Sequence, residues 1–337
     1  MIRIASILIL SLAAVADAQA SRPTDFSAEL QPAQQALVAG DYKKAYALYA
    51  KRAANNPLAQ FTLGLFHKNG WDRPVDEAAG CRWFEKSARK RIPTAQHYLG
   101  DCLIQGAHRA ADPSAALVLY LDAAAGGHLI SLCSAADLYI KGNGVGKDAK
   151  RGLELCTQAA QAGSPPAMLT LANYYREGKD VAQDLAAARG WYQQAAERRS
   201  SEAQYRLGVM LSEGLGGEPD ANAALLWMES AAAEGYAPAY LPTAILYANA
   251  DVDPETGALR PEHLAKIYLW NSAAKTRTTD SAQLEGIARI DAMVQAVMPI
   301  AWRASLNRQV AEHLAKFNPS APKQPTTPRL NHQRDPS

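Results

Sequence analysis

The sequence predicts an all-α protein, built as a solenoid of stacked antiparallel helix pairs. Three observations predict this fold. Small-residue helix starts recur every 36 residues, at Ala59, Ala95, Ser131, Ala167, Ala203 and Ala239. A turn glycine follows in each of the first five units, and the second half of these units carries a large apolar residue followed by a small pair. A period of this length made of two helices is typical of a stacked α-solenoid.

Each unit has the same internal order. A small residue stands five positions after each start, where a second helix can approach closely, at Gly64, Gly100, Ala136, Ala172, Gly208 and Ala244. The turn glycines are Gly70, Gly106, Gly142, Gly178 and Gly214. An acid follows each turn, where it can cap the second helix by accepting backbone N–H bonds, at Asp76, Asp112, Asp148, Asp184 and Asp220. The large apolar residues are Trp83, Leu119, Leu155, Trp191 and Trp227.

Residues 1–20 are typical of a signal peptide. Arg3 precedes an apolar run from Ile4 to Val15, and Ala18-Gln19-Ala20 forms a small-x-small cleavage site. An uncleaved anchor is the alternative, but the run is well short of the roughly 20 residues that span a bilayer. The sequence therefore predicts cleavage after Ala20, no stable membrane insertion afterwards, and a soluble exported protein of the periplasm.

The mature chain divides into four further parts. Residues 21–57 are expected to form a leader and a first helix pair that turns at Gly40-Asp41-Tyr42, and residues 58–276 six repeats. The sixth repeat carries an insertion from Asp251 to Pro261, which is either a partner-contacting loop or a tolerated surface loop. Residues 277–317 keep helical periodicity without the repeat signature, with Pro299 where a second helix would start, and are expected to cap the stack. The proline-rich tail, residues 318–337, is expected to be disordered.

Composition argues against two classes of protein. Apolar residues make up 48% of the chain and the formal net charge is +2, so neither a disordered chain nor a general polyanion binder is indicated. Lys and Arg alternate with Asp and Glu instead of forming a basic stripe. Nucleic acid is therefore not an expected partner, and a monomer is the expected state.

The four cysteines are expected to pair because export favours disulfides. In an antiparallel stack, the middle of one unit's second helix meets the middle of the next unit's first helix, which places Cys81 beside Cys102. Cys133, near the start of the third unit's first helix, faces the late part of its own second helix, near Cys156. The prediction is therefore Cys81–Cys102 and Cys133–Cys156, with buried unpaired cysteines as the alternative.

Catalytic patterns are weak in this sequence. Ser87-Ala88-Arg89-Lys90 matches the S-x-x-K pattern of β-lactam-reacting enzymes, but Ser87 occupies a small-residue packing position and no companion motif exists. Residues 142–147, with the sequence GNGVGK, look like a phosphate-binding loop but join two helices, as a repeat turn does. Histidines such as His67, His97 and His128 lack metal-ligand companions. We expect no enzyme activity, no cofactor and no metal site.

The repeats resemble the Sel-1-like repeat family, relatives of tetratricopeptide repeats. The resemblance rests on Ala203-Gln204-Tyr205-Arg206-Leu207-Gly208 followed by Gly214-Leu215-Gly216, and on the stretch from Ala187 to Ala196, and it covers residues 58–276 in register. The third unit departs from the usual aromatic pair with Leu155-Cys156, and the sixth lacks the turn glycine at Ala250. The resemblance implies a right-handed superhelix that binds partner proteins, often in bacterial envelopes, with some members acting as immunity proteins against secreted effectors.

By analogy with tetratricopeptide repeats, positions two, six and nine after each start are expected to point into the concave face. The candidate partner-binding residues are Phe61, Lys68, His97, Asp101, Asp137, Asn173, Arg176, Tyr205 and Leu241. Aromatic and charged residues of this kind are enriched at protein interfaces. The leading hypothesis is a protein that neutralises or chaperones another protein, such as a secreted effector. An envelope scaffold for polysaccharide export, motility or stress response comes second, and a β-lactam hydrolase using Ser87 third.

Overall fold

The structure is a computed structural model that describes residues 26–251, 259 and 263–317. The predicted signal peptide, most of the sixth-repeat insertion and the predicted disordered tail lie outside these residues. Within them the chain is α-helical and has no β-strand. None of its described helices is both long enough and apolar enough to cross a membrane.

The helices follow one another as antiparallel pairs, and consecutive pairs pack side by side. The first ten helices are α1 (Gln31–Val38), α2 (Tyr42–Arg52), α3 (Pro57–Asn69), α4 (Glu77–Ala88), α5 (Pro93–Gln105), α6 (Pro113–Ala125), α7 (Ser131–Lys141), α8 (Ala149–Gln161), α9 (Pro165–Glu177) and α10 (Leu185–Glu197). The remaining helices are α11 (Ser201–Glu213), α12 (Ala221–Ala233), α13 (Tyr240–Asp251), α14 (Leu264–Lys275), α15 (Ser281–Val297) and α16 (Arg303–Lys316). The predicted all-α solenoid is confirmed.

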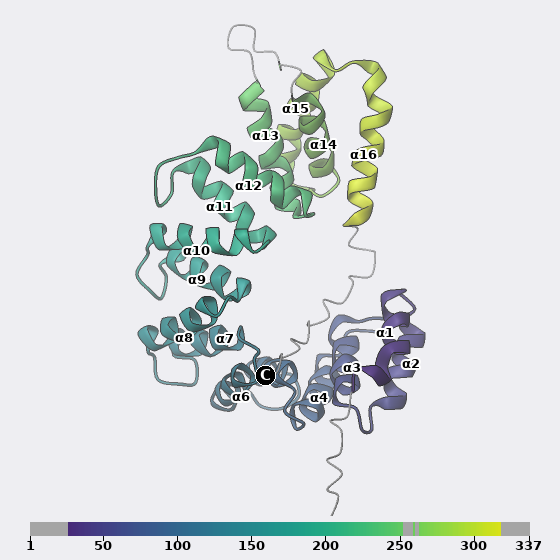
Figure 1. Cartoon of the computed structure of the whole chain (residues 1–337), viewed down its shortest axis with the longest axis vertical. Coiled ribbons are helices and arrows are strands. Elements are labelled where there is room, and N and C mark those ends of the chain that lie inside the picture. The colour runs from purple at the N-terminus through teal and green to yellow at the C-terminus, as the bar shows by residue number, and fades with distance from the viewer. Residues whose placement is uncertain (1–25, 252–258, 260–262, 318–337) are drawn as a thin grey trace, which may run out of the picture.

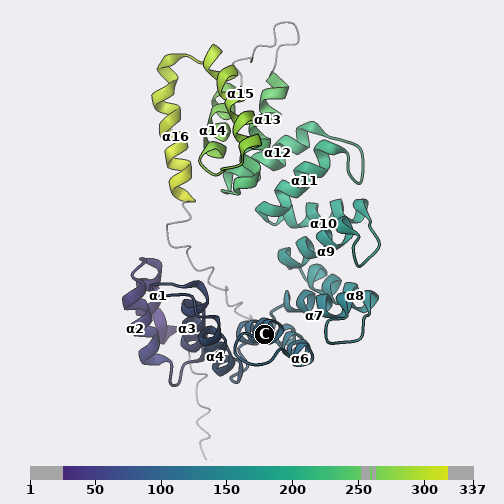
Figure 2. The same ribbon diagram turned by 180° about the vertical axis from the view of Figure 1, so that it is seen from behind.

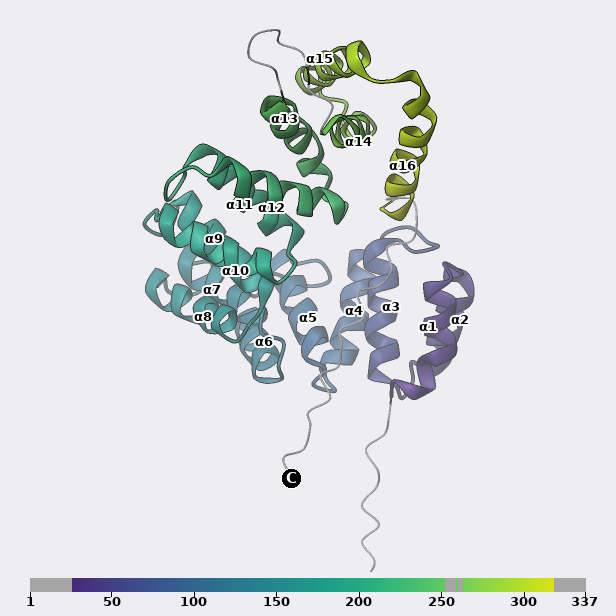
Figure 3. The same cartoon turned by 45° about the horizontal axis from the view of Figure 1, so that its top comes forward.

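The stack curves into an open arc (Figure 1). Helices α1–α4 form one end and α13–α16 the other, and α16 lies on the same side of the molecule as α1 and α3 when the arc is seen from behind (Figure 2) and when it is tilted (Figure 3). The core follows the arc as a series of apolar clusters, each shared by successive helices, as in the cluster of α3, α4 and α5 around Phe84. Each unit is therefore stabilised mainly by its neighbours.

Local sequence signals define both ends of the repeating helices. The five turn glycines adopt left-handed backbone conformations at the ends of α3, α5, α7, α9 and α11. The carboxylate of each predicted capping aspartate accepts a backbone N–H bond at the start of α4, α6, α8, α10 and α12. Asp41 caps α2 in the same way. Such caps each contribute about 1 kcal/mol to helix stability.

The small residue in each first helix lets a large side chain of the second helix lie against the backbone. A Cβ atom added to Gly100 would lie 2.6 Å from Cε1 of Tyr120, and one added to Gly64 would collide with Cε1 of Phe84. The close approach predicted from the sequence is therefore present. The aromatic ring of the second helix fills the space that a side chain at the glycine position would need.

The C-terminal helices close the apolar face of the stack. Helix α15 contributes Ile287, Ile290 and Val294 to the last cluster, and α16 contributes Leu306 and packs against α14. A 3₁₀ turn (Ile300–Trp302) follows Pro299, so α16 begins at Arg303, a few residues later than the proline indicates.

Candidate functional site

Three of the predicted binding residues come together in one hollow of about 400 Å³. His97 and Asp101 belong to α5, and Asp137 belongs to α7. Tyr120 of α6 and Tyr174 of α9 complete its polar wall. We call the hollow lined by these five residues the acidic hollow, because two carboxylates line it. The Asp101 side chain is 33% exposed and the Asp137 side chain is 38% exposed.

Tyrosine hydroxyls hold both carboxylates in place. Tyr120 donates to Asp101 Oδ1 at 2.7 Å, and Tyr174 donates to Asp137 Oδ1 at 2.9 Å. Burial and the adjacent carboxylates raise the pKa of both tyrosines, so they remain hydrogen-bond donors at neutral pH. Lys141 also approaches Asp137, with Nζ 2.8 Å from Oδ1. The carboxylates are therefore pre-oriented, and partner binding would not have to order them.

His97, which lines the acidic hollow, is paired with His128. His97 Nδ1 lies 3.0 Å and His128 Nδ1 lies 2.7 Å from the hydroxyl of Ser131, and the two rings are 4.7 Å apart. Burial lowers the pKa of both rings, and His97 lowers that of His128 further, to about 4. Asp101 Oδ2 lies 3.8 Å from the other nitrogen of His97, Nε2. Ser131 is completely buried, so its hydroxyl joins the two histidines inside the packing between two units.

The other predicted binding residues lie elsewhere along the first helices. Asn173 accepts a hydrogen bond of 2.5 Å from the Tyr192 hydroxyl, and Arg176 Nε donates to the same hydroxyl at 3.1 Å. The ammonium of Lys68 lies 5.5 Å from the Tyr98 ring centre. Tyr205 and Leu241 are half-buried against the C-terminal cluster.

Phe61 is a packing residue in this structure. Only 9% of it is exposed, and its ring lies 5.6 Å from the ring of Phe84 and 5.5 Å from that of Tyr98, centre to centre. We expected Phe61 to present an aromatic surface to a partner, but Tyr98 of the next unit already covers its ring. Its burial therefore does not fit that expectation.

Sequence reasoning missed the two tyrosines of the acidic hollow. Tyr120 and Tyr192 occupy the same position of their units, 25 residues after the start, and each hydroxyl bonds the residue at position six. In the third unit Cys156 stands at that position, and Asp137 takes its hydrogen bond from Tyr174 of the next unit instead. Comparing the repeats position by position would have found the Tyr120–Asp101 hydrogen bond, because Tyr192 repeats it. The Tyr174–Asp137 hydrogen bond crosses between units and needs the structure.

A second hollow, of about 720 Å³, lies between α8 and the turn after α9. Its wall includes Lys150, Glu154, Tyr175 and Asp180, and none of the predicted binding residues lines it. We call it the α8 hollow, and it offers a control surface for the acidic hollow.

Ser87 is a packing residue between α4 and α3 in this structure. It is completely buried, and its hydroxyl donates to the Pro57 carbonyl at 2.8 Å, which joins α4 to the start of α3. The glycine-rich stretch after α7 is the turn of the third unit, with Gly142 as the helix cap. Both match the packing interpretation made from the sequence.

The two predicted disulfides are present. Cys81 of α4 is joined to Cys102 of α5, and Cys133 of α7 is joined to Cys156 of α8. No cysteine is left free. Disulfides of this kind suit an oxidising, exported location.

The stacked helix pairs and their polar hollow define an α-helical repeat protein of the class that offers an extended surface to other proteins. The chain belongs to the Sel1 repeat family. The family model for the Sel1 repeat matches residues 57–91, 93–128, 130–164, 165–200 and 201–236. Helices α13 and α14 continue the stack beyond the last match, in the region where the sequence predicts a sixth repeat.

The fold is similar to that of one solved structure, and two others are less similar to the chain. A Sel1 repeat protein from Oxalobacter formigenes is 25% identical over 74% of this chain and 100% of its own, with a TM-score of 0.56. A protective antigen of uropathogenic Escherichia coli is 20% identical over 91% of this chain and 72% of its own, with a TM-score of 0.44. Immunity protein Pa5087 from Pseudomonas aeruginosa is 18% identical over 60% of this chain and 81% of its own, with a TM-score of 0.46, and the immunity role is stated of that protein. Among curated proteins, none matches the chain.

Proposed function

We propose that this chain is a periplasmic, non-enzymatic protein that binds another protein at the acidic hollow. The observation that carries the proposal is the convergence of His97, Asp101 and Asp137, from two successive units, in one hollow with pre-oriented carboxylates. The Sel1 repeats suggest protein–protein interaction, and the disulfides and the signal-peptide pattern support export.

The chemistry of the hollow indicates what the partner brings. Two exposed carboxylates held by tyrosine hydroxyls favour a Lys or Arg side chain, and half-buried Ile104 and Ile130 line the same hollow with apolar surface. We therefore propose a partner that inserts a basic side chain flanked by apolar residues. Neutralising a secreted effector is the role we propose first, with this chain acting as a monomer.

The test is affinity capture from the periplasm of the native host. The parent is compared with an Asp101→Asn/Asp137→Asn variant, which removes both charges but keeps the acceptors for the tyrosines. A Glu154→Gln/Asp180→Asn variant makes the same change at the α8 hollow. We expect the parent and the α8-hollow variant to retain one stoichiometric partner, and the acidic-hollow variant to lose it, with an affinity at least about tenfold weaker.

Two results would count against this proposal. Equal capture by all three proteins would move the binding surface away from the acidic hollow. Several envelope components at substoichiometric levels would favour the envelope scaffold over a neutralising protein. Far-UV circular dichroism of each variant shows that its helices are intact.

A further inference from the structure

His108 is a buried imidazole whose polar atoms are unsatisfied. It lies in the turn between α5 and α6, and 5% of its side chain is exposed. Among the described residues, neither of its ring nitrogens has a hydrogen-bond partner. Burying an unsatisfied polar group is unfavourable, so a ligand that uses a ring nitrogen would recover this cost.

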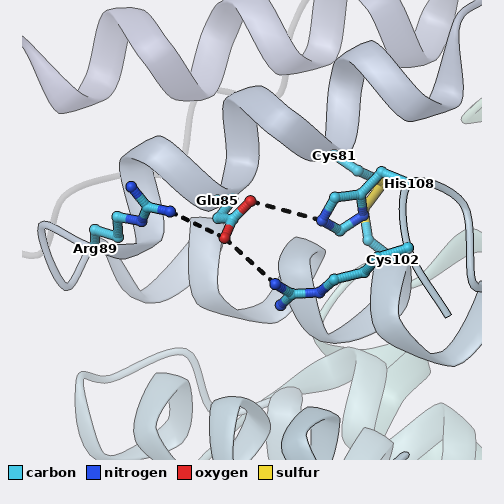
Figure 4. A network of polar contacts seen from close by, with 6 residues as sticks. Cys81, Glu85, Arg89, Cys102 and His108 are labelled. Carbon is cyan, nitrogen blue, oxygen red and sulfur yellow. Dashed lines mark hydrogen bonds and ion pairs between the residues drawn. A yellow bond between two sulfur atoms is a disulfide. The ribbon is translucent and has the colours of Figure 1, made fainter. Parts of the chain in front are cut away.

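The ring lies beside the first disulfide. One nitrogen of His108 and the sulfur atoms of Cys81 and Cys102 all lie within 4.8 Å of one another, and Figure 4 shows the ring against the sulfur pair. In a tetrahedral zinc site, bonds of about 2.3 Å to sulfur and about 2.0 Å to nitrogen separate the ligand atoms by roughly 3.5 to 4 Å. The three ligand atoms are therefore already close to the spacing that zinc requires, apart from the bond between the two sulfurs.

The surroundings of His108 suit a metal-bound imidazole. Glu85 Oε2 lies 3.7 Å from Nε2, which is longer than a hydrogen bond but close enough for a small movement to let the carboxylate orient a metal-bound ring (Figure 4). Arg89 and Arg109 hold the same carboxylate, with nitrogen–oxygen distances of 3.2 and 3.4 Å.

We propose that Cys81, Cys102 and His108 form a zinc site when the Cys81–Cys102 disulfide is reduced. A dithiol supplies two electrons and two protons to the disulfide and becomes a disulfide itself. The two cysteine thiols then bind Zn²⁺ as thiolates and release two protons. Three protein ligands leave a fourth position for water. Because both sulfurs are buried, the turn that carries His108 has to open before the dithiol can reach them.

The second disulfide provides an internal comparison. Cys133 and Cys156 form a disulfide of similar loop length, but among the described residues no His, Asp or Glu joins their sulfurs in a group that could hold a metal. The proposed zinc site therefore uses one disulfide of the two, and it is independent of partner binding at the acidic hollow.

The test uses Co²⁺ as a spectroscopic probe, followed by displacement with Zn²⁺. Full mature chains are prepared with either disulfide replaced, as Cys133→Ser/Cys156→Ser or Cys81→Ser/Cys102→Ser, and each is reduced with a phosphine. We expect the first protein to bind one Co²⁺ per chain with thiolate-to-cobalt charge-transfer absorption, and to bind none when oxidised. The second protein should bind at least about tenfold more weakly in the reduced state.

His108→Ala in the Cys133→Ser/Cys156→Ser background separates a folded site from loose binding by two thiols. We expect it to weaken Co²⁺ and Zn²⁺ binding at least about tenfold. Unchanged affinity in this variant overturns the proposal, whether the reduced chain is folded or unfolded. So does equal charge-transfer absorption from the Cys81→Ser/Cys102→Ser protein, or the absence of that absorption from the reduced Cys133→Ser/Cys156→Ser protein.

Discussion

At the scale of single residues, the repeat uses glycine in two different environments. Gly100 lies under the Tyr120 ring, 2.6 Å from an added Cβ to Cε1, whereas Gly190 lies inside α10 with nothing within 4 Å of such a Cβ. Gly100→Ala should therefore force the ring or the helix to move and destabilise the protein by about 1 to 3 kcal/mol. Gly190→Ala should stabilise it by up to about 1 kcal/mol, because alanine is the better helix former. Urea unfolding of both variants measures the difference, and a Gly100→Ala protein as stable as the parent would contradict the close approach.

The histidine pair makes stability depend on pH. His128 has a pKa lowered by burial, and then by His97, to about 4 in the folded protein, against about 6.5 in an unfolded chain. The unfolded state therefore binds more protons between these values, so the stabilisation is complete above about pH 6.5 and is lost as the pH falls toward about 4. His128→Gln removes this titration. The urea midpoint should fall more for the parent than for the variant between about pH 7.5 and pH 5, and equal falls would show that His128 does not contribute.

At the scale of helices and their pairing, the sequence predicts the helix ends, because interactions between residues close in the chain determine them. The left-handed glycine at Gly142 and the capping carboxylate of Asp148 act within a few residues of their positions, so periodicity alone locates both ends of the turn. Cysteine pairing was also predictable, because both pairs join helices that the antiparallel order already places together.

Contacts between units are less accessible to sequence reasoning. Position two is occupied by Phe61 in one unit and by His97 in the next, yet Phe61 is buried and His97 reaches the acidic hollow. The difference comes from the neighbouring unit, where Tyr98 covers Phe61. A positional analogy treats equivalent residues alike, whereas their exposure depends on the side chain that the following unit supplies.

At the scale of the whole molecule, the covalent links are unevenly distributed. Both disulfides lie between α4 and α8, and α9–α16 contain none. The disulfides close loops with sequence separations of 21 and 23 residues, and each stabilises by about 3 kcal/mol in the chain-entropy model. Because a solenoid is stabilised mainly between neighbours, its two halves can unfold separately.

The arc should therefore unfold from its C-terminal half. In hydrogen-exchange experiments at rising urea concentration, amide protection in α9–α16 should be lost before protection in the cross-linked pairs α4–α5 and α7–α8. After reduction and alkylation of all four cysteines, the difference between the two halves should shrink or vanish, because the loop-closure contribution is removed. If both halves of the oxidised protein lost protection at the same urea concentration, this prediction would be wrong. The coupling free energy across the interface between α8 and α9 would then exceed the difference in stability that the disulfides create between the halves.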